Sequence, residues 1–137
     1  MSKTFLYRLF GIGKLPAELI AELEKEGIIL FDEAIRGTAT YRNFRAPGRY
    51  SNWKRQWFSS AIILTKQHLL ALRLRSEIIN VLLTDERFRQ MQFSLEDDEK
   101  TLLVKFDASL FHDDWSGTIE YRFQTTQAKE FFNKLRY

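Results

Sequence analysis

The sequence predicts a mainly β fold: a curled antiparallel barrel or roll of about seven strands, preceded by a short helix and closed by a C-terminal α-helix. Three features indicate this class. After Gly27 the chain consists mostly of apolar runs and apolar–polar alternations, separated by polar, Gly or Pro residues. Helical spacing of apolar residues occurs near the two ends of the chain. Strands do not alternate with helices, which argues against a parallel α/β sheet.

Length and composition indicate one packed domain. The 137 residues are 45% hydrophobic and 15% aromatic, which is typical of a globular protein rather than a disordered one. The chain has no cysteine, so disulfides, thiolate catalysis and cysteine-bound metals are excluded. We therefore expect a single domain over residues 1–137. Its parts are an N-terminal extension and helix (1–26), a barrel (27–124) and a C-terminal helix (125–137).

The first helix is predicted over residues 15–26. Pro16 suits a first helical turn, apolar residues follow at helical spacing, and Gly27 ends the pattern. The apolar stretch 5–12 is interrupted by Arg8 and has no cleavage site, so we do not expect it to act as an export signal. We expect it to pack on the domain or on a second copy in a homo-oligomer; an amphipathic membrane anchor is the alternative. The expected location is cytoplasmic, with contact to the inner face of the membrane as an option.

The strands are predicted from apolar runs and period-2 alternation. They cover residues 28–31, 38–44, 57–64, 70–75, 78–83, 90–95, 102–106 and 119–123. Polar, Gly and Pro residues at 46–48, 65–68 and 97–100 predict turns between them. In the run 70–75, Leu alternates with Ala or Arg, which predicts a hairpin with one face in solvent.

The last predicted element is an amphipathic helix from about Thr126 to the end of the chain. Its apolar residues have the spacing i, i+3, i+4 and i+7: Ala128, Phe131, Phe132 and Leu135. Thr125 or Thr126 is its expected cap. An antiparallel sheet of this size must hide its edges by curling, and Phe131 and Phe132 could plug an open end of it.

Charge is distributed unevenly along the chain. Residues 34–76 contain nine Lys or Arg and no Asp or Glu; of the 21 basic and 18 acidic residues in the whole chain, this leaves 12 basic and 18 acidic elsewhere. Aromatic residues are interleaved with the basic ones in this segment. We interpret the segment as an anion-binding surface at one hairpin connection, because arginine offers paired donors to phosphate and carboxylate groups. The candidate residues are Arg42, Arg45, Arg49, Lys54 and Arg55.

The nature of the anion stays open at this point. Acidic lipid headgroups or an acidic protein are favoured, because the acidic remainder of the chain opposes the wrapping of a long polyanion. Nucleic-acid binding by the same basic, aromatic-rich face is the alternative. The simplest interpretation is a basic face that is only solvated and binds no ligand. Trp53 and Trp57 are four residues apart and share a face of a strand; we predict Trp57 to lie in the core.

No pattern of residues predicts catalysis or a metal. His112 stands beside Asp113 and Asp114, but His68 is the one other histidine, and we interpret the segment 111–115 as a polar loop. Residues 11–14 lack the glycine pattern and the strand–helix setting of a phosphate loop. The expected protein is a non-enzymatic binding or adaptor module without cofactor.

Two stretches resemble a known superfamily. Residues 53–58, Trp-Lys-Arg-Gln-Trp-Phe, are similar to the opening of the second strand of pleckstrin homology (PH) domains, and residues 63–72 resemble a hairpin of GRAM and bacterial PH-like domains. The resemblance covers roughly 28–135 and implies a PH-like barrel with a terminal helix. Phosphoinositide-binding members carry an Arg two residues after a basic residue; here Gln56 stands two residues after Lys54. Many members of the superfamily bind proteins or have no known ligand.

Overall fold

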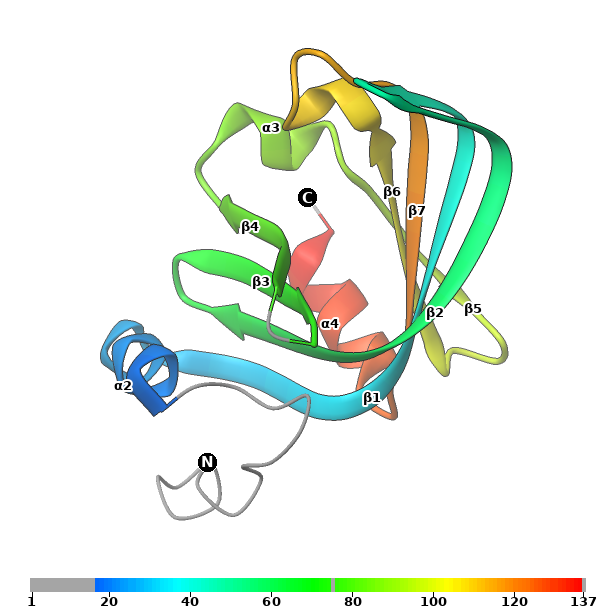
Figure 1. Ribbon diagram of the computed structural model, residues 1–137. Coiled ribbons are helices and arrows are strands. Elements are labelled where there is room, and N and C mark those ends of the chain that lie inside the picture. The colour runs from blue at the N-terminus through cyan, green and yellow to red at the C-terminus, as the bar shows by residue number, and fades with distance from the viewer. Residues whose placement is uncertain (1–16, 75, 137) are drawn as a thin grey trace.

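The computed structural model describes residues 17–74 and 76–136, which form an antiparallel sheet with short helices (Figure 1). In chain order the elements are α2 (Ala17–Glu26), β1 (Ile28–Ala46), β2 (Arg49–Thr65), β3 (His68–Arg73), β4 (Ser76–Leu82), α3 (Glu86–Arg89), β5 (Gln92–Glu96), β6 (Thr101–Asp107), the 3-10 turn η1 (Ala108–Leu110), β7 (Ser116–Gln124) and α4 (Ala128–Leu135). The mainly β antiparallel class, the helix before it and the C-terminal helix are confirmed. Residues 15–16 of the predicted first helix, and the stretch 5–12, lie outside the described residues.

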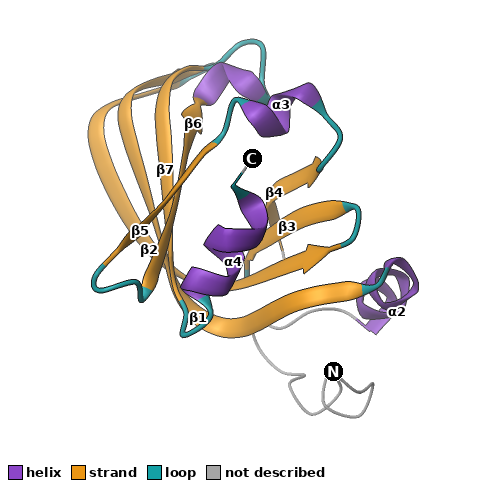
Figure 2. Ribbon diagram, turned by 180° about the vertical axis from the view of Figure 1, so that it is seen from behind, coloured by secondary structure: helices purple, strands orange, loops and turns teal. Residues whose placement is uncertain are grey.

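The seven strands form one sheet in the order β4-β3-β2-β1-β7-β6-β5. The sheet curls strongly, and α4 lies within its concave side (Figure 2). Among the described residues, β4 and β5 are the two edge strands and do not pair with each other. The molecule is therefore an open roll, and the closed barrel considered from the sequence is not formed.

β1 and β2 make a hairpin much longer than predicted. The expected strands 28–31 and 38–44 are parts of one strand of 19 residues. A bulge near Ala34, whose φ is +55°, keeps the two parts paired with β2. The polar residues between them have partners: the Asp32 carboxylate accepts a hydrogen bond from the Thr125 hydroxyl. Their polarity therefore does not break the strand.

The roll has a core on each side of its sheet. The larger core lies on the concave side and contains residues of α4 and of all the strands. A smaller one forms on the convex side, where Leu23 of α2 packs over Ile63, Leu70 and Leu72. Leu69 and Ala71, on the other face of β3, are buried in the larger core. The prediction of a solvated face on this strand is wrong, because the face of Ala71, expected in solvent, packs in the larger core, while α2 covers the face of Leu70 and Leu72.

α4 fills the roll with one phenylalanine rather than two. Phe131 is fully buried, whereas Phe132 is only partly buried against the same core. The helix cap is Gln127, not a threonine. The Thr125 hydroxyl still accepts a hydrogen bond from the Gln127 backbone N–H, so it organises the turn one step earlier than expected.

Candidate anion-binding site

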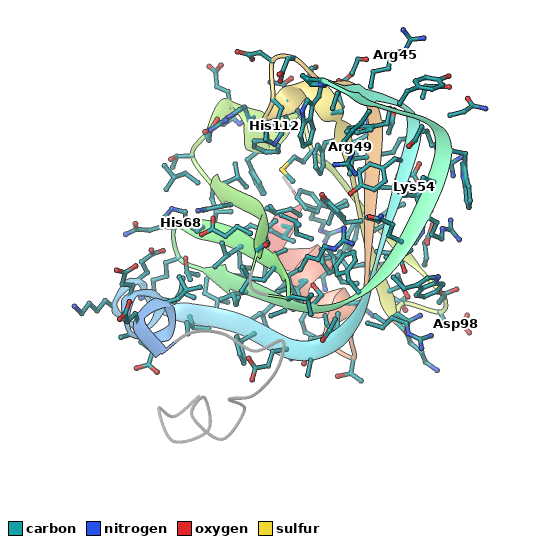
Figure 3. All side chains as sticks on the ribbon, viewed as in Figure 1. Arg45, Arg49, Lys54, His68, Asp98 and His112 are labelled. Carbon is teal, nitrogen blue, oxygen red and sulfur yellow. The ribbon has the colours of Figure 1, made fainter. Side chains whose placement is uncertain are left out.

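The β1–β2 hairpin carries the five predicted basic residues, but it divides them between its two faces. Tyr41 is paired with Lys54, and Arg42 with Trp53, in the register of the hairpin. Directly opposed residues of antiparallel strands share a face, and neighbouring positions alternate. Figure 3 shows Arg49 and Lys54 pointing into the roll, with Arg45 pointing away from it. The single basic cluster expected from the sequence is therefore split.

Two residues fix the hairpin tip against the loop that precedes β7. Asn43 has a φ of +49° and marks a one-residue irregularity in the pairing of β1 with β7, so that Phe44 returns to the core. Gly117 has a φ of +99°, and a Cβ there would collide with the Asn43 carbonyl oxygen. Glycine thus permits the close approach that brings His112 and Trp115 beside the hairpin.

A cavity of about 190 Å³ opens on the concave side at this end of the roll. Residues from β1, β2, β4, β7 and the loop before β7 line it: Tyr41, Phe44, Arg49, Ser51, Lys54, Glu77, Ile78, His112, Trp115 and Tyr121. We call it the inner pocket. The side chains of Arg49 and Lys54 form no hydrogen bond or ion pair with any residue that the structure describes. The inner pocket thus holds two cations whose charge is not neutralised by a bonded partner.

Aromatic rings support the inner pocket. The His112 ring stacks on Trp115 with 3.6 Å between ring centroids, and Trp115 meets the edge of Phe44 at 5.3 Å. Burial, together with the neighbouring Tyr41 hydroxyl, raises the pKa of Tyr121. Its hydroxyl therefore stays protonated at neutral pH and can donate a hydrogen bond.

One carboxylate, Glu77, also lines the inner pocket. Its Oε2 accepts a hydrogen bond of 2.8 Å from the Asn80 side-chain amide, at the exposed surface of β4. With Arg49 and Lys54 against one carboxylate, the formal charge of the lining is +1 when His112 is neutral. The pocket can accept an anion by charge-assisted hydrogen bonds from the two cations, with hydroxyl donors beside them.

On the convex face, Arg42 already has a partner. Its Nε donates to Glu120 Oε2 at 2.8 Å, and Arg122 lies 3.0 Å from the other Glu120 oxygen and 2.8 Å from Glu96. Burial alone would raise the pKa of Glu120, but the hydrogen bonds from Arg42 and Arg122 outweigh it, and the pKa is lowered. Arg42, a candidate ligand residue from the sequence, is thus engaged in an internal ion pair.

The prediction that Trp57 lies in the core is wrong. Trp57 and Trp53 are 58% and 54% exposed, on the convex face of β2. They lie beyond the part of that face that α2 covers. Each ring has a guanidinium over it: Arg36 is 5.0 Å from the centroid of Trp57, and Arg55 is 5.3 Å from that of Trp53. Such contacts hold the arginines in place without neutralising them.

At the hairpin tip, Arg45 lies 4.9 Å from the centroid of the Tyr50 ring, which is 60% exposed. Arg45 forms no ion pair with the described residues. The tip therefore presents a free cation and an aromatic ring to solvent, close in sequence to Arg49 of the inner pocket.

The two histidines lie apart. His112 is at the inner pocket, whereas His68 Nδ1 is 2.8 Å from Glu26 Oε1, in the contact between α2 and the β2–β3 turn. Among residues 17–74 and 76–136, no three His, Asp or Glu side chains come together as a group that could hold a metal ion. The same part of the chain contains no helix of the length and apolarity needed to cross a membrane.

Several lining residues were not singled out from the sequence. Tyr41 could have been found, because it stands opposite Lys54 once the turn at 46–48 sets the hairpin register. Trp115 and Glu77 could not, because the curling of the sheet brings them to the hairpin from distant parts of the chain.

No protein-family model matches this sequence, and no curated protein matches it either. The chemistry of the inner pocket and of the hairpin therefore carries the functional argument.

Proposed function

We propose that the protein is a non-enzymatic binding module that holds a compact anionic group, a phosphate, in the inner pocket. The observation that carries this proposal is the pair Arg49 and Lys54, which share one cavity and have no bonded partner among the described residues. Both residues are exposed to solvent, so an external anion can reach them and accept charge-assisted hydrogen bonds from both. Tyr41 and Ser51 add hydroxyl donors around it, and His112 adds a ring N–H.

The size of the cavity favours a compact group over a polymer. A volume of about 190 Å³ holds roughly six water molecules at ~30 Å³ each. A phosphate and the first atoms of its carrier fit such a space. A nucleic acid would need a longer basic track, and the division of the basic residues between two faces does not supply one.

A lipid is the favoured carrier of the phosphate. The seven-stranded antiparallel sheet and the helix after its last strand support a PH-like fold. Beside the inner pocket, the tip exposes Tyr50 and Arg45, residue types that suit a membrane interface with anionic headgroups. The module would then dock tip first, with a headgroup phosphate in the inner pocket.

Binding without turnover agrees with the surroundings of His112. Its ring is stacked on Trp115, and no hydrogen bond to a carboxylate or hydroxyl of the described residues orients it. A general base normally needs such an orienting partner.

The test uses sedimentation with vesicles of phosphatidylcholine containing phosphatidic acid, whose headgroup is a bare phosphate. The pocket variant Arg49→Gln/Lys54→Gln should lose retention by at least about tenfold, because each charge-assisted hydrogen bond contributes about 1.5–3 kcal/mol. The control Lys105→Gln/Lys134→Gln removes the same charge from exposed positions outside the inner pocket and should retain nearly all binding.

Two further arms separate the sources of phosphate. Pure phosphatidylcholine vesicles should retain little protein. Glycerol phosphate should compete with the vesicles; if it binds by calorimetry while the vesicles do not, the ligand is a soluble phosphate. Equal binding by the parent, the pocket variant and the control would contradict the proposed site.

A further inference from the structure

The β2 strand has a free edge along its first half. On the side away from β1, residues 60–64 pair with β3, and the Leu74 N–H reaches the Ser59 carbonyl. No strand of the described chain pairs with residues 49–58 on that side. Figure 1 shows this part of β2 as the outermost ribbon of the sheet, and Figure 2 shows the same from behind. A row of backbone N–H and C=O groups is therefore open to another strand.

Cations flank this free edge on both faces of the sheet. Arg55 is on the convex face, between Trp53 and Trp57, and Lys54 is on the concave face. Residues 49–58 contain three basic residues, Arg49, Lys54 and Arg55, and no acidic one. Two copies paired through this edge would bring like charges together, which is destabilising. The edge thus disfavours a second copy and favours a strand that carries acidic side chains.

Contacts with neighbouring side chains fix the position of the Arg55 guanidinium beside the free edge. It lies over the Trp53 ring, and its Nε donates to the Thr40 hydroxyl at 3.0 Å. It makes no ion pair with the described residues, whereas Arg42 on the same face is paired with Glu120. The two terminal nitrogens of Arg55 are the donors that a carboxylate binds in a paired geometry.

We propose that the free edge of β2 accepts an extended acidic segment of a partner protein as an additional antiparallel or parallel strand. Backbone groups would supply the pairing, and acidic side chains would meet Arg55 on one face and Lys54 on the other. Along one face of a strand, side chains recur every ~6.8 Å. Acidic residues at alternate positions of the partner strand therefore lie on one face of the sheet. Acidic residues at adjacent positions lie on opposite faces and can meet both Arg55 and Lys54. A lipid or a nucleic acid has no backbone amides to pair with the edge. The proposal does not depend on a phosphate in the inner pocket.

The probe is a fluorescein-labelled peptide of about nine residues, alternating Glu with Thr or Val, which matches the length of the free edge. We expect saturable binding at low salt, followed by fluorescence anisotropy. Amide hydrogen exchange measured by NMR should slow at alternate positions within residues 49–58, because only every second N–H points to the free side. Absence of saturable binding up to about 1 mM would overturn the proposal.

Two chemical controls separate strand pairing from charge attraction. The same peptide N-methylated at alternate residues is made in two versions, one for each set of amides. One of the two should bind at least about tenfold more weakly, because its methyl groups block the paired edge. Equal binding by both versions and by the unmodified peptide would show attraction by charge alone and would overturn the proposal. A peptide with Lys in place of Glu should not bind.

The matched protein variants are Arg55→Glu and Lys105→Glu, which make the same charge change on the convex face of β2 and of β6. Arg55→Glu should weaken peptide binding at least about tenfold, while its retention on phosphatidic acid vesicles stays near that of the parent. Lys105→Glu should change neither. An equal loss of peptide binding in both variants would mean that net charge alone governs the interaction, and would contradict a strand-specific edge.

Discussion

At the scale of single residues, Asn43 and Gly117 decide where the inner pocket forms. Asn43 turns the β1 backbone so that Phe44 enters the core, and Gly117 lets β7 begin directly against that turn. Both residues have positive φ values, in the left-handed region of backbone conformation. Residues other than Gly, Asn and Asp adopt this region at an energetic cost.

Gly117→Ala should therefore destabilise the protein by at least ~2 kcal/mol. The new methyl group would collide with the Asn43 carbonyl oxygen, and alanine would have to adopt the positive φ of Gly117. Gly48→Ala is the matched control: its φ is +74°, but a Cβ there meets nothing within 4 Å. It should cost only ~1 kcal/mol. Urea unfolding followed by tryptophan fluorescence measures both. A Gly117→Ala variant as stable as Gly48→Ala would argue against the close approach.

Glu120 is the second residue with a large local role. It is only 5% exposed and binds two arginines, so its carboxylate is the centre of the polar network on the convex face. Because its pKa in the folded protein is lowered from 4.5, the unfolded chain takes up the proton first as the pH falls. Its contribution to stability is complete above pH 4.5 and is lost as the pH falls through the lower, folded-state pKa.

The Glu120→Gln variant should reveal this dependence. Between about pH 7 and pH 5, the parent should exceed the variant in unfolding free energy by a constant amount, and the difference should shrink below about pH 4.5. Urea unfolding at a series of pH values measures it. Glu96→Gln, which touches only Arg122 of the two arginines, should show a smaller effect. A parent–variant difference that persists unchanged at low pH would contradict the assignment.

At the scale of elements, α4 and α2 each cover one side of the sheet. α4 inserts Phe131 and Leu135 into the concave core, and α2 lays Leu23 on the convex one. The contact of α2 is completed at its end, where Glu26 accepts a hydrogen bond from the Thr65 hydroxyl and lies against His68. Covering both faces is what buries both sides of β3.

Phe131→Ala should leave a cavity in the concave core and lower the unfolding free energy by ~3–5 kcal/mol. Phe132→Ala should cost clearly less, because that ring is only partly buried. Paired urea denaturation curves with equal slopes give both values. Equal losses for the two variants would mean that α4 is rotated relative to this structure.

At the scale of the whole molecule, the basic segment is divided by the sheet that contains it. Arg49 and Lys54 serve the concave side, while Arg36 and Arg55 stack on tryptophans of the convex side and Arg45 on Tyr50 at the tip. The proposed phosphate pocket and the proposed strand-binding edge therefore lie on one hairpin. An adaptor that holds a phosphate and a partner protein together would use both.

The local elements could be predicted from the sequence because their signals are local. Period-2 alternation located β7, an apolar run located β6, the Pro47-Gly48 turn located the tip of the β1–β2 hairpin, and helical spacing located α4. Each of these signals depends on the order of apolar and polar residues within a few positions of the chain, so it can be recognised without knowledge of the tertiary structure.

Only the tertiary structure decided which face of each strand is buried and which element covers it. Whether Trp57 is buried depends on how far α2 extends over the convex face, and whether Arg49 and Lys54 share a cavity depends on the curl that brings Trp115 and Glu77 to them. These are contacts between segments far apart in the chain. Sequence by itself determined the alternating, hairpin-rich class and its charged segment; packing determined which side of each strand meets protein and which meets solvent, because burial is a property of neighbours in space.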